Sequence, residues 1–493
     1  MSTPPLRFDN SYARLPEVFS TRVAPERVPA PERIRMNEPL AEHLGIDLAW
    51  LRSEAAVRAF AGNEVPEGAS TIATVYAGHQ FGAWNPRLGD GRAILLGELI
   101  GKDGGRYDVQ LKGSGRTPYS RGGDGKAPLG PVLREYVVSE AMAALGIPTS
   151  RSLAAVTTGE SVFRDGGPLP GAVLTRVAQS HIRVGTVQFF AAQGDRATLR
   201  TLLDHVVARH YPDARDAQNP YRGLLDGVIA RQAALVARWL SVGFIHGVMN
   251  TDNMLLSGET IDYGPCAFLD EYDPGRVYSS IDHGGRYAFG NQPRIAHWNL
   301  AALAQAMLPL LDDDPDRALA SAQSALDAFS DLFLTARRRT MLAKLGIAAH
   351  REEDDALVDA LLAAMAAERA DFTLTFRRLT ELADPSRPSE IASIFELPPA
   401  LEPWGQRWRE RLAREDGTPA ERRRRMAAVN PVFLPRNHLV EAAIAAAVQR
   451  QDFGPFHDLV NLLARPFEWR EDASGYALPP RPEQVVRQTF CGT

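Results

Sequence analysis

The hydrophobic pattern of this 493-residue chain changes character near residue 180. Before that point the pattern predicts β-strands over residues 93–100, 107–112, 152–157 and 171–177. From about residue 187 onward, apolar residues recur every three to four positions, which is typical of helices. Helices are predicted over 201–210, 224–242, 298–311, 315–345, 354–380, 403–414, 437–449 and 455–464. We therefore predict an α+β protein with a small β-rich part, residues 1–180, followed by a large helical part, residues 181–493.

The first 35 residues contain six prolines, which favour extended backbone and oppose regular helices. We expect this segment to wrap the surface. Two short helical patterns follow it, over 38–44 and 48–60.

Glycine is concentrated between Gly89 and Gly130, where 12 of 42 residues are glycine and about three are expected from 40 in 493. Such density allows backbone N–H groups to approach phosphate closely. Two pieces stand out, Leu88–Arg92 and Gly122–Lys126. Neither matches a Walker A loop or the kinase glycine-rich loop, so flexible surface turns remain the alternative.

Lys112 ends the predicted strand 107–112, and a helical pattern follows over 131–145. Glu135 in that helix lies 23 residues after Lys112, as in the strand-lysine and helix-glutamate pair that holds nucleotide phosphates in kinases. Glu140, a little over one turn further on, is the competing partner.

The stretch from His246 to Gly264 carries the clearest candidate chemistry. Its apolar residues and the Ser257-Gly258 turn predict a short hairpin that brings Asp252 and Asn253 toward Asp262. Carboxylate and amide oxygens suit Mg²⁺ or Mn²⁺, with phosphate oxygens completing the shell. Asp252 is then free to accept a proton from an attacking hydroxyl, although a turn capped by these side chains is the plainer alternative.

This layout resembles the catalytic loop and the metal-binding Asp-x-Gly of protein-kinase-like enzymes. Together with the change of pattern near residue 180, it predicts a kinase-like bilobal fold with nucleotide between a β-rich N-lobe and a helical C-lobe. One position departs from the kinase pattern. The kinase base follows the loop histidine by two residues, and Val248 stands there.

Arg176 and Arg183 lie in or just after the strand predicted at 171–177. Arginine forks suit bidentate phosphate binding, but two arginines seven residues apart are also common on protein surfaces. The residues alone leave both interpretations open.

Composition limits the classes of binding partner and the cellular compartment that we expect. The net charge of −5 gives no reason to expect nucleic acid or an anionic membrane as partner, and no apolar run is long enough to span a bilayer. Two cysteines exclude a disulfide framework, and the N-terminus lacks a signal pattern. We expect a cytoplasmic protein.

Beyond its kinase-like features, the chain resembles the selenoprotein O family. The segments that carry the resemblance run in family order across nearly the whole chain: residues 76–86, 88–92, 110–126, 250–254, 261–268 and 430–437. The resemblance implies a pseudokinase-like fold and protein AMPylation, in which AMP moves from ATP to a protein Ser, Thr or Tyr hydroxyl and pyrophosphate leaves. It also implies that ATP binds in a flipped orientation, with the α-phosphorus facing the acceptor.

The resemblance assigns roles by matching motif. It implies that Asp252 is the base, that Lys112 and Glu135 form an ion pair, and that Asn253 and Asp262 hold Mg²⁺ or Mn²⁺. The residues expected to contact ATP are Gly89, Gly91, Arg92, Lys112, Asp124, Gly125, Arg176, Arg183 and Asp262.

Some family members carry selenocysteine near the C-terminus, where this chain has Cys491. We therefore hypothesise a reversible Cys266–Cys491 disulfide that would pin the tail over the active site; two unrelated thiols are the alternative.

Three other functions remain open from the sequence. The same machinery could transfer UMP from UTP, an atypical kinase could recruit Asp252 as its base, and a nucleotide-binding scaffold could act without catalysis. Intact Lys112, Asp252, Asn253 and Asp262 argue against the scaffold, and Val248 argues against the kinase.

Overall fold

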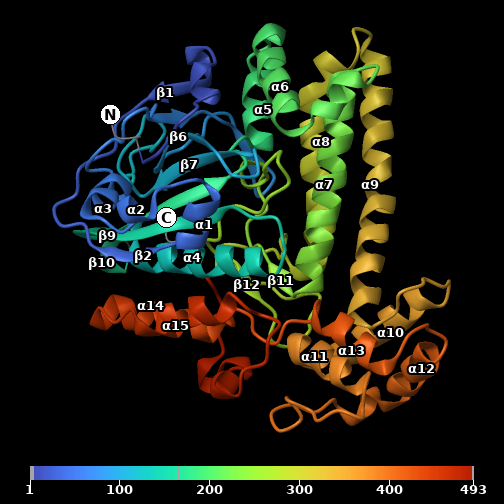
Figure 1. Ribbon diagram of the computed structural model, residues 1–493. Helices are drawn as coiled ribbons and strands as arrows, with labels where there is room; N and C mark the ends of the chain where they lie inside the picture. Colours follow the sequence, from blue (N-terminus) through green and yellow to red (C-terminus); the bar gives the residue numbers. More distant parts are fainter. Residues whose placement is uncertain (1–4, 165, 491–493) are drawn as a thin grey trace.

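The computed structural model describes residues 5–164 and 166–490. It is a mixed α/β structure in which an antiparallel sheet is built by the N-terminal part of the chain and is followed by helices (Figure 1). The predicted mixture of strands followed by helices is therefore confirmed.

The main sheet has eight strands in the order β1-β3-β6-β7-β10-β9-β2, with β8 pairing beside β7 on β10. Their bounds are β1 Ser20–Arg22, β2 Arg33–Met36, β3 Ile72–Thr74, β6 Ala93–Ile100, β7 Arg106–Lys112, β8 Ala127–Pro128, β9 Arg151–Arg164 and β10 Gly167–Ala178. Two small antiparallel strand pairs stand apart from the main sheet: β4 Gly78–Gln80 with β5 Ala83–Asn85, and β11 Phe244–Ile245 with β12 Ala267–Phe268.

The described residues of the N-terminal segment are mostly exposed or half-buried and contain no α-helix, as predicted for an extended surface segment, but they also contribute strands to the sheet. β1 and β2 pair at the two ends of the main sheet, and the Tyr12 and Phe19 side chains are buried. The prolines at 16, 25, 29 and 31 all fall outside these strands, where they remove no sheet hydrogen bond.

The helices account for most of the chain beyond residue 180. Their bounds are α1 Glu38–His43, α2 Leu48–Leu51, α3 Glu54–Ala61, α4 Leu129–Ala144, α5 Val184–Ala192, α6 Arg196–His210, α7 Pro220–Ser241, α8 Gln292–Leu311, α9 Pro315–Lys344, α10 Asp354–Ala367, α11 Phe372–Leu382, α12 Glu402–Leu412, α13 Pro419–Ala427, α14 Asn437–Arg450 and α15 Gly454–Leu463. The single helix predicted over 354–380 is two helices, because Arg369 adopts a left-handed φ of 51° and Asp371 caps the start of α11.

Helix packing places the β-rich part beside the long helices (Figure 1). α4 packs on β9 and β10, with α14 and α15 on its other side, while α7, α8 and α9 lie side by side. Among the described helices, none combines the length and the apolar character needed to cross a bilayer.

Candidate functional site

The segment from His246 to Gly264 is a wide loop, and the predicted hairpin is wrong. Its base is closed by pairing of β11 with β12, outside both ends of the segment. The apolar residues expected to pair within it pair elsewhere: Val184 N donates to Met254 O at 2.9 Å and Leu256 N to Ile182 O at 3.0 Å. The loop is thereby fastened to the chain that enters α5.

Four charged side chains from four different elements meet beside this loop. Lys112 Nζ at the end of β7 lies 2.5 Å from Glu135 Oε2 of α4 and 3.1 Å from Asp262 Oδ1. Arg176 of β10 donates to both Glu135 and Asp262. We call these four residues the charge cluster. Its members are almost fully buried except Asp262, whose side chain is 23% exposed, so Asp262 faces the open side.

The two glutamates of α4 that competed for Lys112 have separate partners. Glu135 lies in the charge cluster, whereas Glu140 accepts hydrogen bonds from the Arg151 guanidinium at 2.9 and 2.7 Å. Positions 135 and 140 therefore point to different sides of the helix.

The charges of the cluster are held in place by one another. Burial alone would raise the pKa of Asp262, but Arg176, Lys112 and Arg183 outweigh it and hold that pKa well below its ordinary value. Burial acts on Glu135 in the same direction, and Arg176 and Lys112 likewise lower its pKa. Burial and the charge of Arg176 lower the pKa of Lys112, to which Arg92 also contributes.

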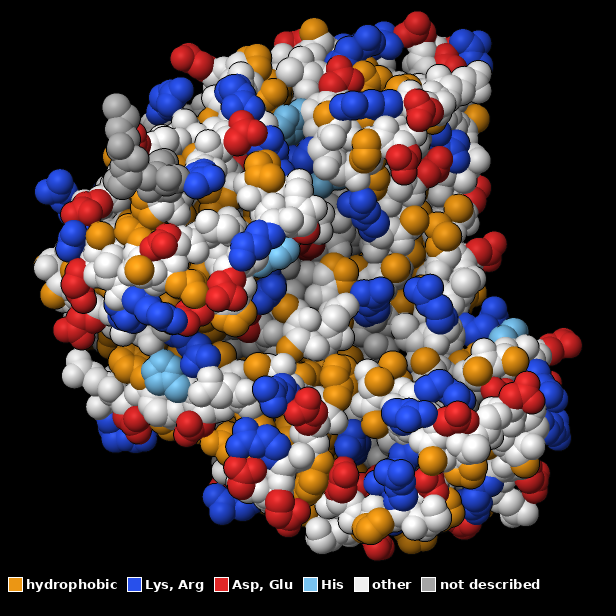
Figure 2. Space-filling model, in the orientation of Figure 1, with side chains coloured by type: hydrophobic (Ala, Val, Ile, Leu, Met, Phe, Trp, Pro, Cys, Tyr) orange, Lys and Arg blue, Asp and Glu red, His pale blue; other side chains and the backbone are white. Residues whose placement is uncertain are grey.

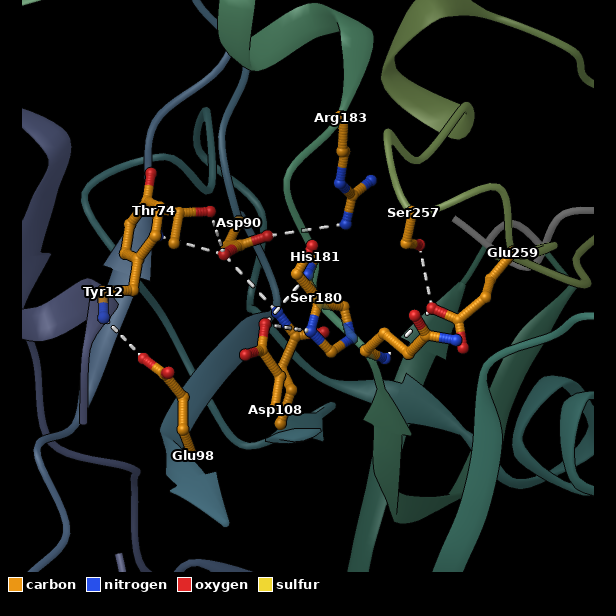
Figure 3. A network of polar contacts seen from close by, with 12 residues as sticks. Tyr12, Thr74, Asp90, Glu98, Asp108, Ser180, His181, Arg183, Ser257 and Glu259 are labelled. Atoms are coloured by element: carbon orange, nitrogen blue, oxygen red, sulfur yellow. Dashed lines mark hydrogen bonds and ion pairs between the residues drawn. The ribbon is translucent and has the colours of Figure 1, made fainter. Parts of the chain in front are cut away.

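Arg183 connects the charge cluster to Asp252. Its guanidinium donates to the backbone oxygen of Asp252 at 2.7 Å and to Asp262 Oδ2 at 3.3 Å. It also lies 4.5 Å over the Tyr76 ring and 3.7 Å from Asp90 Oδ1, as Figure 3 shows for Asp90. Because Arg183 stands immediately before α5, the start of that helix fixes its position.

Asp252 lies in a 3₁₀ turn, Thr251–Asn253, and is buried. Its Oδ2 accepts a hydrogen bond from Gln80 Nε2 at 3.2 Å, and its Oδ1 has no hydrogen-bond partner among the described residues. Burial raises the pKa of Asp252 to about 6. Such a carboxylate is a stronger base than an exposed one and is still ionised at neutral pH.

The glycines singled out in the sequence meet close backbone or ring contacts. Gly89 has a φ of 103°, and a Cβ there would lie 2.5 Å from Tyr119 Cγ. A Cβ at Gly91 would lie 2.8 Å from Tyr119 O, and one at Gly125 would collide with the backbone of Gly115. Only glycine fits these turns, whatever they bind.

The Asp124 side chain is hydrogen-bonded to groups outside the charge cluster. Its carboxylate accepts from Arg164 at 2.8 Å and from Lys126 N at 3.0 Å. The structure therefore does not join Asp124 to the charge cluster.

A second buried polar network contacts Arg183 through Asp90 (Figure 3). This network was not predicted from the sequence. Asp90 accepts from Thr74 N at 3.0 Å and from Thr74 Oγ1 at 2.6 Å. Asp108 accepts from His181 N at 2.8 Å and from Arg209 at 2.6 Å. These bonds fix the chain between β10 and α5, and Asp90 in the Leu88–Arg92 segment was the available signal.

Asn253 and Asp262, the residues expected to hold a metal, carry one amide oxygen and one carboxylate. Asn253 Nδ2 donates to Val248 O at 3.0 Å, which fixes the direction of its Oδ1. No group of three or more His, Cys, Asp or Glu among the described residues could hold a metal by itself. This donor set fits Mg²⁺ or Mn²⁺, which are commonly held by one or two carboxylates together with substrate phosphates and water.

Cys266 is a buried free thiol whose Sγ lies 3.6 Å from Tyr263 O. Burial raises the pKa of this thiol to about 12, so the reactive thiolate is disfavoured. Cys491 lies outside the described residues, and its pairing with Cys266 stays a prediction.

Comparisons with known proteins agree over the whole chain. A family model described as protein adenylyltransferase SelO matches residues 3–464. A protein nucleotidyltransferase YdiU of Rhodopseudomonas palustris (strain BisB5) is 59% identical over 487 residues, and the alignment covers 99% of each chain. A protein nucleotidyltransferase YdiU of Methylorubrum extorquens is 60% identical over 493 residues, also with 99% of each chain covered.

Glu259 is a buried carboxylate in the same loop that the sequence did not single out. Its Oε2 accepts from Gln179 N at 3.0 Å and from Ser257 Oγ at 2.8 Å, and no Lys, Arg or His among the described residues lies within 4.0 Å (Figure 3). Burial raises the pKa of Glu259 from 4.5 to about 7.

This pKa predicts a pH-dependent stability. The folded protein holds the Glu259 proton more tightly than the unfolded chain, so the stabilisation is full below the unfolded pKa and is lost as pH rises through about 7. Between pH 5 and pH 8 we expect wild type to lose up to about 3 kcal/mol relative to Glu259→Gln, which cannot ionise. Urea unfolding of both proteins across this range measures the difference, and parallel curves would contradict the prediction.

Proposed function

The chain belongs to the protein adenylyltransferase SelO family, which confirms the resemblance seen in its sequence, and we propose that it transfers AMP from ATP to Ser, Thr or Tyr hydroxyls of proteins. It is accordingly an enzyme of the nucleotidyltransferase class.

One observation carries the proposal: Asp252, a buried carboxylate with one oxygen that has no hydrogen-bond partner among the described residues, is tied through Arg183 to the charge cluster. Nucleotidyl transfer needs an oriented hydroxyl, a proton acceptor and neutralisation of phosphate charge rather than covalent help. ATP brings about four negative charges. Lys112, Arg176 and Arg183 supply positive charge, and Arg92 lies close enough to lower the pKa of Lys112.

In the proposed reaction the acceptor oxygen attacks the α-phosphorus of ATP. The new bond joins that oxygen to the phosphorus, the bond between the α-phosphorus and the bridging α,β oxygen breaks, and pyrophosphate leaves. The hydroxyl proton passes to Asp252. Lys112, Arg176 and Arg183 offset the charge on the phosphates, and Arg183 holds the Asp252 backbone in place. A Mg²⁺ or Mn²⁺ ion held by Asn253 and Asp262 would supply further charge neutralisation when bound.

We propose that ATP binds in the flipped orientation, with its α-phosphorus toward Asp252. Val248 supports this orientation, because it occupies the position of the kinase base. Its apolar side chain is buried, and its backbone carbonyl accepts a hydrogen bond from the Asn253 side chain. The ATP contacts of Gly89, Gly91, Asp124 and Gly125 are part of the same proposal, as is a kinase-like division into lobes at residue 180.

A second candidate is transfer of UMP from UTP, since the charge cluster would treat any nucleoside triphosphate alike. An atypical kinase and a non-catalytic scaffold are the remaining rivals. The raised pKa of Asp252 favours catalysis over a scaffold. Among the described residues no cation pairs with its carboxylate, and a buried carboxylate of that kind is costly for the fold.

Labelled nucleotides separate the four functions. We expect protein acceptors to take label from α-labelled ATP and none from γ-labelled ATP, because the α-phosphorus faces the acceptor. α-Labelled UTP is run in parallel. Label from the γ position alone would identify a kinase. Transfer from UTP in preference to ATP would identify a uridylyltransferase, and no transfer from any nucleotide would identify a scaffold.

Asp252→Asn removes the proton acceptor and keeps the shape of the side chain. We expect kcat for AMP transfer to fall by about 10²- to 10⁴-fold, with the Kd for ATP changed less than about twofold, since Asp252 does not touch the cations through its carboxylate. Asp331→Asn, at an exposed position of α9, is the matched control and should behave as wild type. Unchanged turnover in folded Asp252→Asn protein would remove this residue from the mechanism.

Asp262→Ala removes the carboxylate shared by Lys112, Arg176 and Arg183. We expect near-complete loss of AMP transfer at saturating Mg²⁺ and Mn²⁺, at least about 10²- to 10³-fold. We also expect a loss of up to about 3–5 kcal/mol in unfolding free energy. Among the described carboxylates, Lys112 and Arg176 would then share only that of Glu135, and Arg183 would keep only the more distant Asp90. Circular dichroism and urea unfolding show how much of the lost activity comes from unfolded protein. Asp262→Asn, which keeps the size of the side chain, is the milder variant. Substantial turnover in either folded variant would count against the site.

A further inference from the structure

The β4–β5 hairpin lies directly on the turn that carries Asp252. His79 N donates to Thr251 Oγ1 at 2.7 Å, and Gln80 Nε2 donates to Asp252 Oδ2 at 3.2 Å. A Cβ at Gly78 would lie 2.6 Å from Asp252 Oδ1, so the approach requires glycine. This hairpin stands outside the main sheet and borders the reacting position.

The hairpin presents aromatic rings to solvent instead of burying them. Phe81 is 37% exposed and Trp84 is 42% exposed, and Trp298 of α8 is 36% exposed. The His79 ring joins two of them, with its centroid 4.9 Å from Trp84 and 5.2 Å from Trp298. The Phe81 ring packs on the buried Tyr287, with 5.0 Å between the centroids. Single exposed apolar residues are ordinary, whereas Trp84 and Trp298, joined through His79, form a patch of the kind that marks an interaction site.

Arg286 adds one positive charge to this patch. Its Cζ lies 4.9 Å over the Trp298 ring, and a Cβ at Gly82 in the hairpin turn would lie 3.6 Å from it. No carboxylate among the described residues lies within 4.0 Å of its guanidinium, and its buried Nε has no hydrogen-bond partner there. We call Phe81, Trp84, Arg286 and Trp298 the hairpin platform.

We propose that the hairpin platform docks the polypeptide segment that carries the acceptor hydroxyl, and that it selects acceptors flanked by an apolar and an acidic side chain. The inference rests on the proposed function and names its substrate class. Phe81 follows Gln80, the residue bonded to Asp252, and neighbouring residues of an extended chain are about 3.3 Å apart. The register pairs His79 with Trp84, so these two rings lie on the face of the hairpin opposite the Gln80 side chain. A peptide with its hydroxyl at Asp252 would reach the rings and Arg286 by passing over the hairpin tip at Phe81.

The charge of the surface favours a polypeptide over a nucleic acid. The platform holds a single arginine, and the chain carries a net charge of −5. On the face drawn in Figure 2, basic and acidic side chains are interspersed without a broad basic area. A polyanion needs many phosphate contacts, whereas one acidic side chain needs one cation.

A peptide library with one tyrosine acceptor tests the proposal. Leucine, glutamate, lysine or alanine is placed at each of the three positions on either side of the tyrosine, and AMP transfer from α-labelled ATP is measured as kcat/KM. We expect wild type to prefer a glutamate position over alanine by about tenfold and to disfavour lysine there. Arg286→Ala should abolish the glutamate preference alone, and Trp84→Ala should abolish the leucine preference alone. Trp298→Ala also removes the ring beneath the Arg286 guanidinium and should weaken both preferences.

The readouts separate docking from catalysis. The KM for ATP, measured through pyrophosphate release with a saturating tyrosine peptide that has alanine at all flanking positions, should stay within about twofold of wild type in all three variants. Arg200→Ala and Leu319→Ala, at exposed helical positions, are the matched controls and should keep both preferences. Peptide labelling that ignores the flanks, or preferences that survive in the platform variants, would overturn this inference and leave AMP transfer intact. Absence of α-label transfer to any protein or peptide would instead refute the proposed function.

Discussion

The shared carboxylate of Asp262 is the interaction on which the rest of the site depends. It joins β7 through Lys112, β10 through Arg176 and the start of α5 through Arg183, and Glu135 of α4 closes the same cluster. Replacing such a cluster with apolar side chains need not lower stability, but removing one member leaves a buried charge unpaired. Asp262 has a φ of 62°, a strained backbone conformation for a residue other than glycine. The cluster thus specifies where the loop sits against the sheet more than it adds to stability.

The same arrangement suits the proposed nucleotide. Of the two carboxylates in the charge cluster, Asp262 is the one on the open side, and both of its oxygens contact cations. Phosphate oxygens can compete for Lys112, Arg176 and Arg183, which would release the Asp262 oxygens for a divalent ion. The cations are pre-positioned by Glu135, Tyr76 and Asp90, so little reorganisation accompanies the exchange.

Local signals predicted the elements that they fully specify. β6 is a nearly continuous apolar run and β7 alternates polar and apolar residues, and a glycine turn joins the two strands. α4 ends before Gly146, as its sequence indicates, and begins at Leu129, two residues before the predicted start at Pro131. α5 was missed because Val184–Ala192 is apolar on nearly every side and shows no amphipathic period. The hairpin predicted at 246–264 failed because its apolar residues pair with residues 182–184, a contact between distant segments that alternation cannot reveal. Arg176 and Arg183 followed only from the family resemblance, since a lone arginine carries no signal of burial.

Val248 shows how the loop differs physically from a kinase loop. Its side chain is buried, and its carbonyl accepts the Asn253 side chain, so the position contributes through its backbone. A carboxylate at position 248 would be buried and would lose its hydration. A buried carboxylate without a neighbouring cation tends to become protonated. At Asp252 the environment is different: Gln80 donates to one oxygen, Arg183 holds the backbone, and the raised pKa still leaves the carboxylate ionised at neutral pH. The proposed base at Asp252 therefore stands at a different position in the loop from the kinase aspartate, which is consistent with the proposed flipped orientation of ATP.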